Sequence, residues 1–285
     1  MNHYRYYFSL LRRLPHAVIR RIMRKSCQSY PATAPYLTGK YGLEIGGPSG
    51  IFCRGHLIPV YSLCRGIDIC NFSTQTIWGK PTNRPRFGPR PGKQFVAEAS
   101  DLSMVPDATY DFVLASHVLE HIANPLRALQ EWKRVLNPEG TVLVVVPDKR
   151  ETFDHRRAVT PFNHIEADFI ANTPEDDLTH LDEVLSLHDL ALDPPAGSRQ
   201  QFRERCLRNH SVRAMHHHVF SLETLALMFS RLQMRVLTAT IESPYHIVAF
   251  AQKADPAEHK LVRLHNLRFQ TSGLAHNVAR AKRSS

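Results

Sequence analysis

The sequence predicts an α/β fold built on a mostly parallel, doubly wound sheet. Three observations support this class. A short strand-like run at residues 41–45 is followed at once by glycines. Strand-like and helix-like segments then alternate as far as residue 147, as in a sheet with helices on both faces. The predicted strand at residues 141–146 is almost continuously apolar, which is typical of a strand covered on both sides.

The turn after the first strand carries the main functional signal. Glu44 lies between two apolar residues at the end of the strand, and Gly46, Gly47 and Gly50 follow. Glycine permits a positive φ and lets a ligand approach backbone N–H groups closely. A carboxylate beside such a turn favours a cationic or polar ligand group and disfavours a phosphate. An ordinary strand-to-loop connection remains the alternative for this stretch alone.

Acidic residues follow the next two predicted strands. The second strand, at residues 65–69, contains Asp68, which lies 24 residues after Glu44, where an acid would reach ribose hydroxyls in a β-α-β unit. The third, at residues 94–97, is followed by Glu98, placed to accept a hydrogen bond from an adenine amino group. A surface position at a strand end is the alternative for Asp68.

The next segments complete the predicted alternation. Residues 110–115 form a buried fourth strand, after which Ser116 and His117 follow. A helix is expected from Pro125 to about Leu136, with Asn124 as its cap. The fifth strand follows at residues 141–146.

The positive charge belongs to the two ends of the chain. The net charge is +10, but residues 1–26 hold seven Lys or Arg and no acid, and residues 253–285 have a net charge of +5. About −2 is left for the centre, which disfavours a basic nucleic-acid groove. Residues 3–26 have an amphipathic helical pattern that suits either an anionic membrane surface or packing on the domain. We therefore divide the chain into a basic segment (1–35), a catalytic domain (36–253) and a basic helix or tail (254–285).

The cysteine pattern indicates the compartment. The five cysteines form no C-x-x-C pair, so we expect reduced thiols in a cytoplasmic protein, with possible peripheral contact to a membrane through the basic N-terminal segment. No apolar run approaches the ~20 residues of a membrane span.

The ordered set of motifs resembles the class I S-adenosylmethionine-dependent methyltransferases. The matching stretches are GLEIGGPSG at 42–50, Asp68, EASDL at 98–102, YDFVLASHVLEHIANP at 110–125, VLNPEGTVLVVVP at 135–147 and, more weakly, residues 216–253. The resemblance implies a Rossmann-like, seven-stranded sheet whose last two strands form an antiparallel pair. It also implies S-adenosylmethionine as the cofactor, and the ammonium and sulfonium of this molecule suit the carboxylate-flanked turn.

The resemblance also implies roles for particular positions. Glu44 would lie near the methionine ammonium or the turn that holds it, with Gly46, Gly47 and Gly50 in that turn. Asp68 would bind the ribose. The adenine would contact Glu98 and Ala99, and Ser116 and His117 would line the pocket. Pro48 replaces a glycine that the family usually has.

A narrower resemblance concerns the methyl acceptor. PDKRETFDHRR at 147–157, EDDLTHLDEVLSLHD at 175–189 and the HHHVF run resemble bacterial methyltransferases of polysaccharide and glycan assembly. This implies O-methylation of a sugar or glycan intermediate, a small-molecule or glycan acceptor.

The long segment at residues 148–215 is expected to be a helical insertion over the carboxyl ends of the strands, where α/β sheets bind ligands. A hydroxyl acceptor benefits from a general base, and Asp154, His155, His217 and His218 are the candidates. Three consecutive histidines, 216–218, cannot all point to one centre on a regular element, but two of them with Asp154 or His155 could, so a metal site is the competing interpretation. No helical metal motif is present, and no metal is expected.

Two other classes of protein stay open at this point. A dinucleotide-dependent oxidoreductase is disfavoured by Glu44 and by the incomplete G-x-G-x-x-G pattern. A basic membrane-binding or nucleic-acid-binding protein, including an RNA methyltransferase, would depend on the charged ends. No specific nucleic-acid partner is expected.

Overall fold

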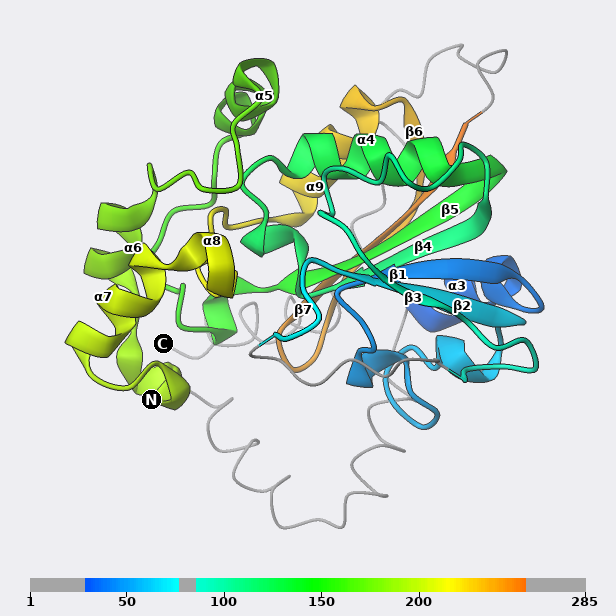
Figure 1. Ribbon diagram of the computed structural model, residues 1–285, viewed down its shortest axis with the longest axis horizontal. Helices are drawn as coiled ribbons and strands as arrows, with labels where there is room; N and C mark the ends of the chain where they lie inside the picture. Colours follow the sequence, from blue (N-terminus) through cyan, green and yellow to red (C-terminus); the bar gives the residue numbers. More distant parts are fainter. Residues whose placement is uncertain (1–28, 77–85, 255–285) are drawn as a thin grey trace, which may run out of the picture.

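A seven-stranded mixed sheet forms the centre of the molecule (Figure 1). The computed structural model describes residues 29–76 and 86–254. Within them the strand order is β3-β2-β1-β4-β5-β7-β6. The first five strands in this order are parallel to one another, and β7 is antiparallel to both of its neighbours. The strands are β1 (Tyr41–Ile45), β2 (Gly66–Asn71), β3 (Gln94–Val96), β4 (Tyr110–Ser116), β5 (Leu136–Pro147), β6 (Met234–Glu242) and β7 (His246–Lys253). This topology confirms the predicted fold class.

Helices cover both faces of the sheet. Helices α4 (Pro125–Val135) and α9 (Leu222–Arg231) lie on one face, and α3 (Ser29–Leu37) lies on the other (Figure 1). The predicted start of α4 is confirmed, because the Asn124 side chain accepts a hydrogen bond from Arg127 N at 3.0 Å.

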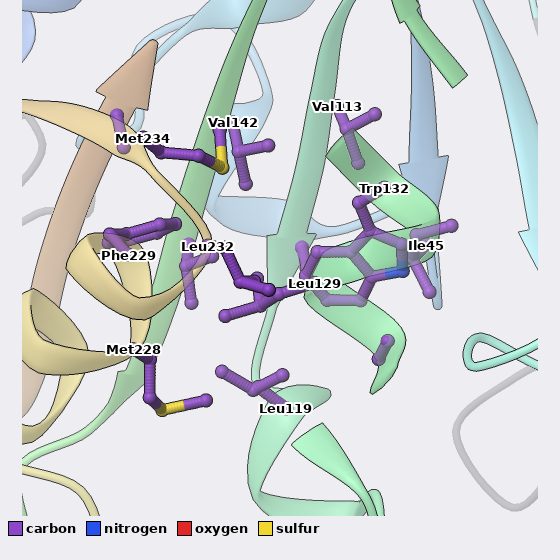
Figure 2. Packing of buried hydrophobic residues seen from close by; sticks show 14 of the residues in the cluster. Ile45, Val113, Leu119, Leu129, Trp132, Val142, Met228, Phe229, Leu232 and Met234 are labelled. Carbon is purple, nitrogen blue, oxygen red and sulfur yellow. The ribbon is translucent and has the colours of Figure 1, made fainter. Parts of the chain in front are cut away.

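Alternate side chains of each central strand point to different cores. On β4, Val113 and Ala115 join the core beneath α4 and α9, and Phe112 and Leu114 join the core on the opposite face. Figure 2 shows the first core, where Trp132 packs among aliphatic side chains of the sheet and helices. Because both faces are buried, the strands are apolar without alternation.

The fifth strand is longer than predicted. β5 begins at Leu136, which pairs with Tyr110, and regular pairing resumes at Thr141 opposite Phe112. The residues between them, which predict a turn, form an irregularity within the strand, and Glu139 adopts a φ of 61° there. Polar turn residues therefore interrupt the pairing without ending the strand.

The insertion follows Pro147 at the carboxyl end of β5. Its elements are η4 (Lys149–Glu151), α5 (Phe162–Ala171), α6 (Leu181–Leu187), η5 (Leu190–Leu192), η6 (Pro194–Ala196), α7 (Arg199–Leu207) and α8 (Asn209–Val212). Helices α6, α7 and α8 gather at one end of the molecule, on the left of Figure 1. Val184, Phe202 and Met215 belong to a small core of their own there, so the insertion is a packed unit.

The predicted ends of the domain fall partly outside the described residues. The amphipathic segment at residues 3–26 and the basic tail beyond residue 254 are among the residues not described, so membrane contact stays a prediction. Helix α3 crosses the predicted boundary at residue 35 and packs on the sheet, where Ser29 N donates to Glu242 Oε1 at 2.9 Å. Residues 29–35 therefore belong to the domain. Of the described helices, none has the length and apolar character needed to cross a bilayer.

Candidate active site

The glycine turn after β1 has a conformation that requires glycine at its first position. Gly46 has a φ of 75°, and a Cβ atom there would run into the Val118 side chain. Its N–H donates to Cys70 O at 2.8 Å, which ties the turn to the neighbouring strand. Glycine at this position lets the turn pass close to the Val118 side chain.

Glu44 supports this turn from behind. Its buried carboxylate accepts hydrogen bonds from Ser49 N at 2.9 Å and from Tyr61 Oη at 2.6 Å. Burial raises the pKa of Glu44 to about 7, despite these hydrogen bonds, which lower it. Gly47 lies against the same carboxylate, and a Cβ there would collide with it. Glu44 thus lies against the turn that was expected to hold the methionine and bonds to its backbone, and its side chain does not line the cavity described below.

The Asp68 carboxylate lies toward the amino ends of the strands, so its predicted ribose role is wrong. It pairs with Leu43 in the middle of the parallel register. Its carboxylate accepts hydrogen bonds from Tyr41 Oη at 2.6 Å, Tyr110 Oη at 2.8 Å and Lys93 N at 2.7 Å. These partners begin β1 and β4 or precede β3, so Asp68 joins the amino ends of the strands.

Asn71 holds the position that Asp68 was expected to hold. β2 continues to Asn71, whose Nδ2 donates to Gly47 O at 2.9 Å and which lines the cavity beside the turn. The orientation leaves its Oδ1 as a hydrogen-bond acceptor for a ligand. Residue 71 is an amide and not an acid, so its role could have been inferred only from the correct end of β2.

A cavity of about 620 Å³ opens at the carboxyl ends of β1, β2, β3 and β4. Five of the predicted cofactor residues line it: Gly46, Glu98, Ala99, Ser116 and His117. Gly50 instead lines an adjoining cavity of about 400 Å³, which shares Ser116 and His117 with the first. Cofactor contacts by these residues stay a prediction, and the convergence of four separate strands on one cavity is the observation that supports it.

The insertion supplies the outer wall of this cavity. Arg213 forms an ion pair with Glu98, with Nη2 at 2.8 Å from Oε1, and a second ion pair with Glu175. Glu175 in turn accepts a hydrogen bond from Ala123 N at 3.3 Å. Burial raises the pKa of Glu175, and the Arg213 charge opposes this effect. The guanidinium therefore links the insertion to the loops that follow β3 and β4.

None of the four predicted catalytic residues lines the cavity; of the three consecutive histidines 216–218, His216 does. His155 Nε2 lies 2.9 Å from Asp189 Oδ2, apart from the cavity. His217 is fully buried beside Asn209, and burial lowers its pKa to about 3. His218 Nε2 lies 3.1 Å from Ala123 O. Direct catalysis by these side chains is therefore a wrong prediction.

Asp154 contacts the ring of His216. His216 Nδ1 lies 2.5 Å from Asp154 Oδ2, and Arg157 Nη1 lies 3.2 Å from Asp154 Oδ1. Burial alone would raise the pKa of Asp154, but the charges of His216 and Arg157 lower it to about 2. Burial opposes the charged form of His216 as well, yet the neighbouring carboxylate raises its pKa above the ordinary value. Asp154 thus positions the ring of His216 at the cavity wall.

Two further ionisable residues join His216 there. Glu120 and His121, on η3 (Leu119–His121) directly after β4, are buried and line the cavity. Burial would raise the pKa of Glu120, but the neighbouring His117 and the charges of His121 and His216 lower it. Burial lowers the pKa of His121 to about 4. Sequence reasoning missed Glu120 and His121, although their position just past a buried strand of the sheet was a usable signal.

Comparison with known proteins identifies the family. A family model described as "Methyltransferase domain" matches residues 11–239, so the chain belongs to this methyltransferase family. None of the curated proteins compared with the chain matches it significantly. The protein is therefore a methyltransferase, and the alternative of a dinucleotide-dependent oxidoreductase is wrong.

Solved structures of similar fold come from several organisms. A S-adenosylmethionine-dependent methyltransferase from Mesorhizobium loti is 12% identical, with a TM-score of 0.46, and the match covers 80% of this chain and 99% of that one. One from Methanosarcina mazei is 15% identical, with a TM-score of 0.42 and coverage of 79% and 98%. One from Aquifex aeolicus is 11% identical, with a TM-score of 0.41 and coverage of 85% and 100%.

Proposed function

We propose that this methyltransferase transfers the methyl group of S-adenosylmethionine to a hydroxyl oxygen of a sugar or glycan acceptor. The supporting observation is the group of ionisable side chains at one end of the cavity, where Glu120, His121 and His216 meet. A hydroxyl is a weak nucleophile at neutral pH and needs help to lose its proton. Buried carboxylate and imidazole groups can accept that proton.

The surroundings of this group also suit a sugar. Phe153 and Tyr245 present rings to the cavity, and Glu151 and Thr152 add polar atoms nearby. The Phe153 ring centroid lies 4.8 Å from that of His216, so an apolar surface adjoins the polar group. A pyranose offers both an apolar C–H face and hydroxyl groups, which match such a mixed wall.

The other end of the cavity would hold the cofactor. The backbone at Gly46 would approach the methionine part, Asn71 Oδ1 would accept from a ribose hydroxyl, and Ala99 with Glu98 would contact the adenine. A sulfonium carbon between the two ends would face the acceptor. The hydroxyl oxygen attacks this carbon in line, the C–S bond breaks with its electron pair going to sulfur, and the hydroxyl proton leaves through the ionisable group.

Methyl transfer to defined acceptors tests this proposal. The full-length protein is incubated with methyl-labelled S-adenosylmethionine and separate sets of methyl glycosides, nucleotide sugars, amines and thiols, and labelled products are located by mass spectrometry. We expect label in an ether on a sugar oxygen, and S-adenosylhomocysteine formed in equal amount. Transfer to nitrogen, carbon or sulfur, with none to sugar oxygen, would overturn the acceptor class while leaving the methyltransferase assignment in place.

A further inference from the structure

The three ionisable residues at the acceptor end have the composition of a metal site. Glu120, His121 and His216 each offer one ligand atom, and these atoms lie within 4.8 Å of one another. All three side chains are buried, at 1%, 8% and 8% exposure, and all three line the cavity. They come from two distant parts of the chain, since η3 follows β4 and His216 follows the insertion.

Each histidine in this group is oriented by a second partner. His216 Nδ1 lies 2.5 Å from Asp154 Oδ2, and His121 Nδ1 lies 3.2 Å from Met215 O. Histidines that bind metal ions almost always direct the other ring nitrogen to a carboxylate or a backbone carbonyl. Nε2 would then be the ligand atom of both rings, and each tautomer is the one that coordination requires.

Glu120 adds an unusual feature for a carboxylate at this depth. Both of its oxygens are buried, and neither has a hydrogen-bond partner among the described residues; His117 Nδ1 lies 3.5 Å from Oε1. An ionised carboxylate without hydrogen bonds is strongly disfavoured in a buried position. A bound cation would supply the missing interactions.

We propose that Glu120, His121 and His216 bind a divalent transition-metal ion at the acceptor end of the cavity. Two imidazoles and one carboxylate are ligands that zinc, iron, cobalt and manganese accept, and they leave coordination positions open toward the cavity. The upper limit of 4.8 Å on the separations of the three atoms is compatible with a tetrahedral ion whose bonds are about 2.1 Å long. The proposal of a metal site rests on these side chains and not on the identity of the methyl acceptor.

The chemical role of the ion rests on the proposed function. A hydroxyl of the acceptor would bind the ion directly, and the ion would lower the pKa of that hydroxyl. The three side chains that bind the ion would not accept the proton, so it would pass to water, and the oxygen would attack the methyl carbon as the C–S bond breaks. Two neighbouring hydroxyls of a sugar could bind the same ion, which would fix the position that is methylated.

A second histidine cluster provides an internal control. His164, Asp168, His180 and His218 also lie within 4.8 Å of one another, but none of them lines the cavity. His164 Nε2 lies 3.0 Å from His180 Nε2, so these two rings already bond to each other. The two clusters therefore make different predictions for metal binding.

The experiment measures Co²⁺ binding to the chelator-treated, full-length protein by visible absorption and by calorimetry. We expect one Co²⁺ whose ligand-field bands change when Glu120→Gln, His121→Gln or His216→Gln is introduced, with affinity lower by about 100-fold. Asp154→Asn should lower the affinity by about 10-fold to 100-fold, as loss of an outer partner does. His164→Gln, in the second cluster, and His210→Gln, at an exposed histidine, should retain wild-type binding. Retained binding of S-adenosylhomocysteine shows that each variant is folded.

The outcomes separate the metal site from the acceptor class. Absence of Co²⁺ binding to the wild type would overturn the metal site. Co²⁺ binding that is lost in His164→Gln but kept in Glu120→Gln would overturn it as well. Site-specific Co²⁺ binding in a protein that methylates only nitrogen would support the metal site and refute the sugar hydroxyl. If the protein methylates a sugar oxygen at a rate that a chelator does not change, and binds no Co²⁺, the sugar acceptor would be supported and the metal site refuted.

Discussion

The buried carboxylate of Glu44 makes the stability of the fold depend on pH in a specific direction. Burial raises its pKa in the folded protein from the ordinary value of 4.5 to about 7. A raised pKa means that the folded state binds the proton more tightly than the unfolded state does. The stabilising contribution of the protonated form is fully present below about pH 4.5 and is lost as pH rises to about 7. At about 1.4 kcal/mol for each pH unit, the loss amounts to about 3 kcal/mol.

The substitution Glu44→Gln removes this titration and keeps a polar side chain near Ser49 and Tyr61. Urea unfolding of both proteins, followed by the fluorescence of the buried Trp132, gives the free energy of unfolding at pH 4.5 and at pH 8. We expect the wild type to lose about 3 kcal/mol relative to the variant between these two values. Glu139→Gln, at an exposed acid, controls for the change in net charge. A stability difference that stays constant within about 0.5 kcal/mol would refute the reasoning.

Three further predictions concern the cofactor end and the acceptor end. Gly46→Ala places a methyl group against Val118 at a positive φ. We therefore expect the free energy of unfolding to fall by about 1–3 kcal/mol and the affinity for S-adenosylhomocysteine, measured by calorimetry, to fall as well. Gly50→Ala places its methyl group in open space and should change neither quantity. Asp68→Asn should lower the free energy of unfolding by about 1–3 kcal/mol and leave the affinity for the cofactor unchanged. Asn71→Ala should lower the affinity for the cofactor. Cofactor affinity that falls in Asp68→Asn and not in Asn71→Ala would restore the ribose role of Asp68. Asp154→Asn should lower kcat by about 10-fold or more with KM for the cofactor unchanged, and an unchanged kcat would show that the cavity histidine needs no orienting carboxylate.

The fold was predictable because each of its strong signals is local. The strand-to-glycine turn and the apolar run that became β5 depend on neighbouring residues only, and so does the Asn124 cap. These signals determine which segments are strands and which are helices. The seven-stranded sheet with an antiparallel last pair came from the family resemblance, and the structure confirms both among the described residues.

The site was predicted less well because it depends on strand ends and on distant contacts. Asp68 was placed at a strand end, but the strand runs three residues further, to Asn71. The sequence offers no reason to prefer His216 over His217, since the two are adjacent. Only the folded backbone turns His216 to the cavity and His217 into the interior. Choosing between them requires the position of Asp154, which is 62 residues away.

The insertion completes both ends of the cavity, so the two ends are structurally coupled. Arg157 is buried and donates to the carbonyls of His216 and His217 at 2.9 and 3.0 Å, which fixes the backbone that presents the cavity histidine. Arg213, three residues before His216, forms ion pairs with Glu98 at the cofactor end. A change in the insertion that alters the acceptor would therefore also disturb the cofactor wall. Acceptor specificity in this chain is consequently expected to change through single cavity side chains more readily than through exchange of the whole insertion.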